Sequence, residues 1–153
     1  MNYVFVLALG IGIAAGLRSL TAPAVVAWGA HLGWLNLHGS PLVFMGSTTA
    51  VAIFSVLAIG ELIADKLPMM SKRTAPAPLM ARIVTGALCG ACLCAAAGKS
   101  LLAGAVLGGI SGVIGAFLGY NVRRRLDLHI KDFLVAICED VVAVGLALFF
   151  VSR

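Results

Sequence analysis

Six apolar runs constrain what this chain can fold into more than any other feature of its sequence. They cover residues 3–17, 23–35, 42–64, 78–98, 100–120 and 133–151. Hydrophobic residues make up 61% of the chain and charged residues 11%, against about 25% charged residues in a soluble globular domain. Since about 20 apolar residues cross a bilayer, the length allows about four to six membrane segments and no additional soluble domain. We therefore predict one integral membrane domain over residues 1–153, an all-α, polytopic transmembrane helical bundle.

The first two runs are shorter than a full membrane span. At about 1.5 Å per residue, residues 3–17 and 23–35 would each form roughly 20 Å of helix, while a bilayer core is about 30 Å thick. They are therefore either two tilted short helices or a broken, re-entrant pair. Both alternatives place residue 2 and the loop 36–41 on the same side of the membrane, so the remaining topology does not depend on the choice.

The basic residues orient the predicted bundle. One side of the membrane would carry Arg18, Lys66, Lys72, Arg73, Arg123, Arg124, Arg125 and Lys131. The other side would carry only Lys99 and Arg153. Because cytoplasmic loops hold the excess of Lys and Arg, we predict that both termini are non-cytoplasmic. The net charge of +5 does not indicate nucleic-acid binding, because the basic residues lie in short connections without interleaved aromatic residues.

A glycine series runs through the fifth apolar run. Its members are Gly104, Gly108, Gly112, Gly115 and Gly119. Spacings of three and four place them on one helix face, where small residues let helix backbones approach closely. We expect this face to pack against another helix, although a pore-lining face is the alternative. On so small a chain, the glycine face also predicts a homo-oligomer.

Ionisable residues recur inside the apolar runs, toward the predicted cytoplasmic side. This candidate intramembrane charged cluster consists of Arg18, Glu61, Asp65, Arg82, Glu139 and Asp140. At about 1.5 Å per residue, Glu61, Arg82 and Glu139 lie roughly 6–10 Å from the cytoplasmic ends of their runs. An isolated charge in hydrocarbon costs at least about 2.5–3.5 kcal/mol on insertion scales, so these groups should face one another or water. Glu139 and Asp140 lie about 100° apart on a helix and should address different neighbours.

The charged cluster has two interpretations. In one, surplus carboxylates form a proton or cation route or the arginines bind an anion, since intramembrane ionisable groups often mark such pathways. In the other, Arg18 and Arg82 pair with acids only to hold helices together. Two arginines cannot neutralise four acids, so the partners of the remaining acids decide between the two.

Further basic residues are candidate anion or lipid contacts at the inner face. They are Arg73, Arg123, Arg124 and Arg125. A run of arginines is also an ordinary topology signal. The tetrapeptide Thr-Ala-Pro-Ala at 21–24 and 74–77 predicts two helix starts, with Thr as N-cap and Pro in the first turn.

No catalytic pattern accompanies these charges. The three histidines have no second ligand at a metal-binding spacing, and no Ser-His-Asp, nucleotide-binding or zinc-protease pattern occurs. We therefore expect no enzyme, no catalytic residue, no metal and no cofactor. The expected partners are the lipid bilayer and an anionic lipid or small ion.

Five stretches together resemble a known family. They are "GLRSLTAPAVVAWGAHLGWL" (16–35), "ELIADKLP" (61–68), "APLMARIVTGALCGA" (77–91), "GAFLGYNVRRRL" (115–126) and "EDVVAVGLAL" (139–148). The chain is similar to small bacterial multi-spanning membrane proteins grouped as domain of unknown function four-one-two-six. The resemblance implies a bacterial inner-membrane location and supplies no activity, substrate or site residue. Our hypothesis is a small transporter or channel for an ion or a small anionic amphiphile, and the alternative is a structural or assembly protein.

Overall fold

The described part of the chain folds into six α-helices and one short 3₁₀ helix. The computed structural model describes residues 3–66, 75–126 and 131–153. The elements are α1 (Tyr3–Leu17), α2 (Thr21–His31), η1 (Val43–Gly46), α3 (Thr48–Ala64), α4 (Pro76–Ala96), α5 (Leu101–Leu126) and α6 (Asp132–Val151). No strand occurs in the described ranges. The predicted all-α class is confirmed.

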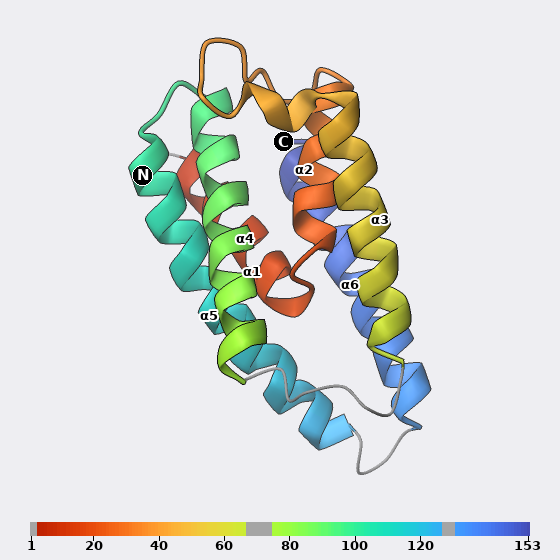
Figure 1. Ribbon diagram of the computed structural model, residues 1–153. Coiled ribbons are helices and arrows are strands. Elements are labelled where there is room, and N and C mark those ends of the chain that lie inside the picture. Colours follow the sequence, from red (N-terminus) through yellow and green to blue (C-terminus); the bar gives the residue numbers. More distant parts are fainter. Residues whose placement is uncertain (1–2, 67–74, 127–130) are drawn as a thin grey trace.

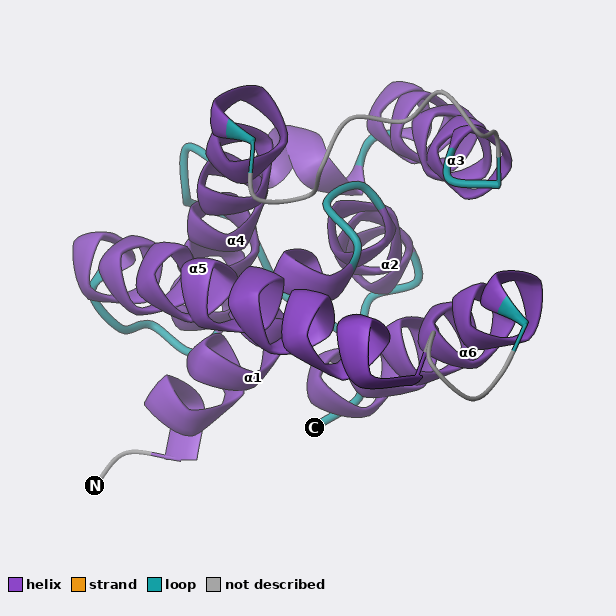
Figure 2. Ribbon diagram, turned by 90° about the horizontal axis from the view of Figure 1, so that it is seen from below, coloured by secondary structure: helices purple, strands orange, loops and turns teal. Residues whose placement is uncertain are grey.

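The short helices α1 and α2 form the centre of the bundle. Helix α1 packs against α4, α5 and α6, and α2 packs against α3, α4 and α6. Figure 1 shows the two as a hairpin between the α4–α5 pair and the α3–α6 pair, and Figure 2 gives the same arrangement from below. Both termini lie toward the end of the bundle that carries the α2–α3 and α4–α5 connections.

Three helices are long and apolar enough to cross a membrane. They are Pro76–Ala96, Leu101–Leu126 and Phe133–Val151. Helices α1 and α3 are also apolar but, at 15 and 17 residues, shorter. The three spans have the pattern of a multi-pass membrane protein.

The elements differ from the predicted runs at three places. Helix α2 ends at His31, and Gly33 follows with a φ of 82°, a conformation that glycine adopts without strain. The run 42–64 divides at Ser47, which is the N-cap of α3. Its backbone is extended, and its side chain accepts a hydrogen bond from the N–H of Ala50 at 3.1 Å. Helix α5 continues past residue 120 to Leu126, so the three arginines belong to its last turn.

The break between α1 and α2 is not capped in the way that the sequence predicts. Thr21 is the first residue of α2 and not its N-cap, and Leu20 before it offers no side-chain cap. The Thr21 hydroxyl is buried and has no hydrogen-bond partner among the described residues. The second copy of the tetrapeptide precedes α4, which begins at Pro76, while Thr74 lies outside the described residues.

The glycine series of α5 faces inward. All five glycines are buried. A Cβ atom on Gly108 would overlap the carbonyl oxygen of Gly86 in α4, and one on Gly115 would overlap the carbonyl oxygen of Ile13 in α1. This face of α5 therefore lies against helices of its own chain.

Candidate functional site

Eight ionisable side chains surround the break between α1 and α2. This group, called the charged layer below, comprises Arg18, Glu61, Asp65, Lys66, Arg82, Arg123, Glu139 and Asp140. All six residues of the predicted cluster belong to it. Arg73 lies outside the described residues, and Arg124 and Arg125 are exposed on the last turn of α5.

Arg18 is the buried centre of this layer. Its side chain is 1% exposed, and its Nη1 atom lies 2.7 Å from Oδ2 of Asp65 at the end of α3. Its Nη2 atom donates to Oδ1 of Asp140 in α6. One guanidinium therefore joins the α1–α2 break to two other helices, which suits its planar set of donors.

Glu61, in α3, accepts hydrogen bonds from the residues that precede α2. Its Oε1 atom accepts hydrogen bonds from the Ser19 backbone N–H at 3.0 Å and the Ser19 hydroxyl at 2.6 Å. Its Oε2 atom accepts from the backbone N–H of Leu20 at 2.8 Å. The first N–H groups of a helix have no partner within it and favour a negative charge, and Glu61 binds that of the N-cap residue Leu20 and that of Ser19 just before it.

Arg82 donates hydrogen bonds to the last carbonyl groups of α1. It is 5% exposed in the first turns of α4 and donates from Nη1 to the carbonyl oxygen of Gly16 and, at 3.0 Å, to that of Leu17. The last carbonyl groups of a helix lack partners within it and favour a cation. The sequence indicated carboxylates as the partners of Arg82 and gave no sign of these carbonyls.

Two further cations, Arg123 and Lys66, join the layer. Arg123 Nη1 lies 3.7 Å from Oδ2 of Asp65, and Lys66 Nζ lies 3.9 Å from Oδ2 of Asp140. With them the layer contains, among the described residues, four cations and four carboxylates. The signal that sequence reasoning missed is the length of α5, because a helix that ends at residue 120 would not place Arg123 here.

A cleft between α3 and α4 reaches this layer. Its volume is about 500 Å³. Apolar walls from Val56, Leu57 and Pro78 lead to Ser19, Glu61 and Arg82. The cleft therefore ends where α1 stops and α2 begins.

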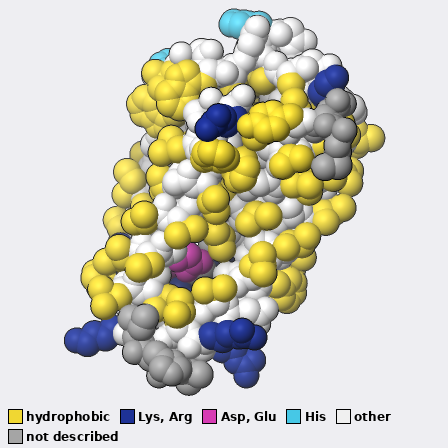
Figure 3. Space-filling model, turned by 180° about the vertical axis from the view of Figure 1, so that it is seen from behind, with side chains coloured by type: hydrophobic (Ala, Val, Ile, Leu, Met, Phe, Trp, Pro, Cys, Tyr) yellow, Lys and Arg dark blue, Asp and Glu magenta, His cyan; other side chains and the backbone are white. Residues whose placement is uncertain are grey.

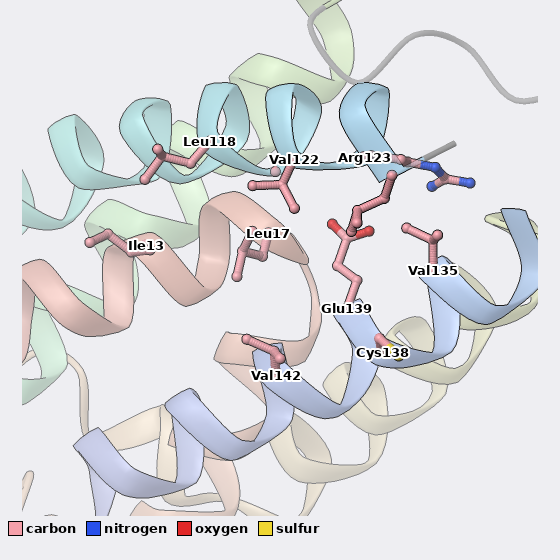
Figure 4. A pocket seen from close by; sticks show the side chains of 11 residues that line it. Ile13, Leu17, Leu118, Val122, Arg123, Val135, Cys138, Glu139 and Val142 are labelled. Atoms are coloured by element: carbon pink, nitrogen blue, oxygen red, sulfur yellow. The ribbon is translucent and has the colours of Figure 1, made fainter. Parts of the chain in front are cut away.

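A separate groove lies between α1, α5 and α6, because α5 and α6 make few contacts with each other. Its volume is about 310 Å³, and its lining is apolar apart from Glu139 and Arg123. Figure 4 shows the Glu139 carboxylate pointing from α6 toward Val122 and Leu17. On the face turned away in Figure 1, an acidic side chain lies in a hollow of a largely hydrophobic surface, with basic side chains below it (Figure 3).

Comparison with known proteins gives one result. Residues 5–152, nearly the whole chain, match the family described as Domain of unknown function (DUF4126). No curated protein and no solved structure matches the chain. The chain therefore belongs to the DUF4126 family.

Proposed function

We propose that the protein is a small transporter or channel that binds an ion or a small anionic amphiphile in the cleft between α3 and α4. The observation that carries this proposal is the cleft itself, which extends to Glu61 and Arg82 at the two ends of an interrupted helix pair. In membrane transporters, discontinuous helices place their ends at the substrate and ion sites, and non-helical backbone at membrane depth is tolerated where it lines a cavity.

Glu61 and Arg82, two of the three charged residues that line the cleft with Asp65, have different roles in this proposal. Glu61 is the group that takes up a proton or a cation, because its carboxylate lies at the cleft and holds α3 on the start of α2. Arg82 is the group that attracts an anionic head, because it lines the same cleft. The apolar walls suit the hydrocarbon part of an amphiphile.

A structural or assembly role is the second candidate, and Arg18 favours it. The ion pairs of Arg18 with Asp65 and Asp140 join three parts of the bundle at a site with 1% exposure. A layer that served only this purpose would hold its charges in pairs and carry no substrate.

The two candidates differ in what charge removal does to flux. Purified chain in proteoliposomes with an internal pH-sensitive dye would report proton flux for the parent, Glu61→Gln and Arg82→Gln. Arg124→Gln is the matched control, because it removes an exposed charge from the end of α5. Transport predicts a changed flux in Glu61→Gln at normal folded yield. A lower yield with unchanged flux would refute transport and support the structural role.

We place the protein, as part of this proposal, in the bacterial inner membrane with the charged layer toward the cytoplasm. The Lys and Arg bias supports this orientation, with both termini non-cytoplasmic. Helices α1 and α2 then form a re-entrant pair. Their 15 and 11 residues correspond to about 22 and 16 Å of helix, short of the roughly 30 Å that a bilayer core requires.

We further propose that the glycine series acts as a glycine zipper within one chain. The overlap that Cβ atoms on Gly108 and Gly115 would cause supports this role, since close backbone approach stabilises helix pairs in lipid. Because the same face lies against α1 and α4, a second copy of the chain would need a different surface.

A further inference from the structure

The two charged residues of the groove between α1, α5 and α6 lie at different depths. Helix α5 ends and α6 begins at the same end of the bundle (Figure 1). Arg123 lies three residues before the end of α5, and Glu139 lies seven residues, about two turns, into α6. Leu126, the last residue of α5, and Val135, in the first turn of α6, also line this end, and a molecule that entered past them would meet Arg123 before Glu139.

Beyond Glu139 the groove is apolar. Ile13 from α1, Leu118 from α5 and Val142 from α6 lie further from the charged end and line its inner part. All three helices are apolar, and α5 and α6 are long enough to span a bilayer, so hydrocarbon is the expected filling of this inner part. From Arg123 inward, the order is therefore cation, hydrogen-bond acceptor, hydrocarbon wall.

We propose that this groove is a binding site for a monoacyl glycerophospholipid. The phosphate lies at Arg123, the unesterified glycerol hydroxyl donates to Glu139, and the single acyl chain runs along Ile13, Leu118 and Val142. A guanidinium has five N–H donors in a geometry that fits phosphate, and a carboxylate accepts from a hydroxyl. The site is distinct from the α3–α4 cleft and does not depend on transport.

The position of Glu139 favours a monoacyl phospholipid over a diacyl phospholipid and over a fatty acid. A diacyl phospholipid carries an ester oxygen where the monoacyl lipid carries a hydroxyl, and an ester has no proton to donate to a carboxylate. A fatty acid has no hydroxyl between its anionic head and its chain, so with its head at Arg123 it offers no donor to Glu139. The monoacyl phospholipid alone among the three presents phosphate, donor and chain in the order of the groove.

Equilibrium binding of radiolabelled palmitoyl lysophosphatidylglycerol to the purified full-length chain in non-ionic detergent tests this site. Arg123→Gln should weaken binding about tenfold or more, and Glu139→Gln about fivefold or more, because each removes a charge-assisted hydrogen bond. Arg125→Gln is the matched control on the same helix turn and should bind within about twofold of the parent, since exposed charges contribute little.

Arg123 also contacts Asp65, so Arg123→Gln could lower the folded yield. Leu118→Trp keeps the test decisive, because it fills the groove without changing a charge and should abolish binding. Unlabelled palmitate and dipalmitoyl phosphatidylglycerol should fail to displace the label. The proposal would be overturned if either of these lipids displaced the label at the concentration at which the unlabelled monoacyl lipid does. Parental affinity in Glu139→Gln and Leu118→Trp would also overturn it.

Discussion

Arg18→Met should destabilise the bundle by about 3–5 kcal/mol. Removing one partner of a buried ion pair typically costs this much, because the other charge stays buried without compensation. Arg18 serves two carboxylates, Asp65 and Asp140, and two independent losses would sum to about 6–10 kcal/mol. Two cations remain to offset part of that loss: Arg123 at 3.7 Å from Asp65 and Lys66 at 3.9 Å from Asp140. The expected loss of unfolding free energy therefore returns to the range for one pair.

The free energy of unfolding, measured by titrating the purified chain in mild detergent with a denaturing detergent, checks this value. Arg125→Met changes the same charge at an exposed position and should shift the free energy by no more than about 0.5 kcal/mol. Adding Asp65→Asn and Asp140→Asn to Arg18→Met should restore most of the loss, since the buried carboxylates disappear with their partner. A loss below about 1 kcal/mol in Arg18→Met, or no recovery in the triple variant, would refute the reasoning.

Three further predictions follow, the first two tested by the same titration and the third in sealed membrane vesicles. Gly108→Ala should cost about 1–3 kcal/mol, because the methyl group would overlap a carbonyl oxygen of α4, whereas Gly109→Ala, whose Cβ meets nothing closer than 3.7 Å, should be neutral or slightly stabilising in the same titration. Gly60→Ala, with open space around the new methyl group, should stabilise α3 by about 0.5–1 kcal/mol, and a loss would contradict the described surroundings. Arg125→Cys should react with an impermeant maleimide only from the cytoplasmic side and Lys99→Cys only from the other, and the reverse pattern would overturn the orientation.

Local signals in the sequence were sufficient to place the helices. Hydropathy located all six described α-helices, with both ends of α1, α4 and α6 within two residues of the predicted runs, because these runs are bounded by turn-forming or charged residues. The division at Ser47 and the end of α2 at His31 were missed, since an apolar connection is indistinguishable from a short helix by hydropathy. Likewise, the length of α5 was underestimated because arginines in a final helical turn resemble a loop.

The contacts of the charged layer were less predictable than its members. Spacing and depth identified Glu61 and Arg82 as residues of the layer, but their partners are backbone groups 41 to 66 residues away in the chain. No periodicity in the sequence encodes such a pairing. Only the three-dimensional arrangement shows that a carboxylate and a guanidinium serve the two ends of one interrupted helix pair.

This arrangement has a consequence for how the chain is inserted during synthesis. Helices α1 and α2 leave the ribosome before α3 and α4, yet the partners of their inner ends are Glu61 in α3 and Arg82 in α4. Unpaired backbone groups in hydrocarbon are costly, so the N-terminal hairpin cannot settle at its final depth on its own. Its docking waits for α3 and α4, so the first two helices to be made take their place only after the next two.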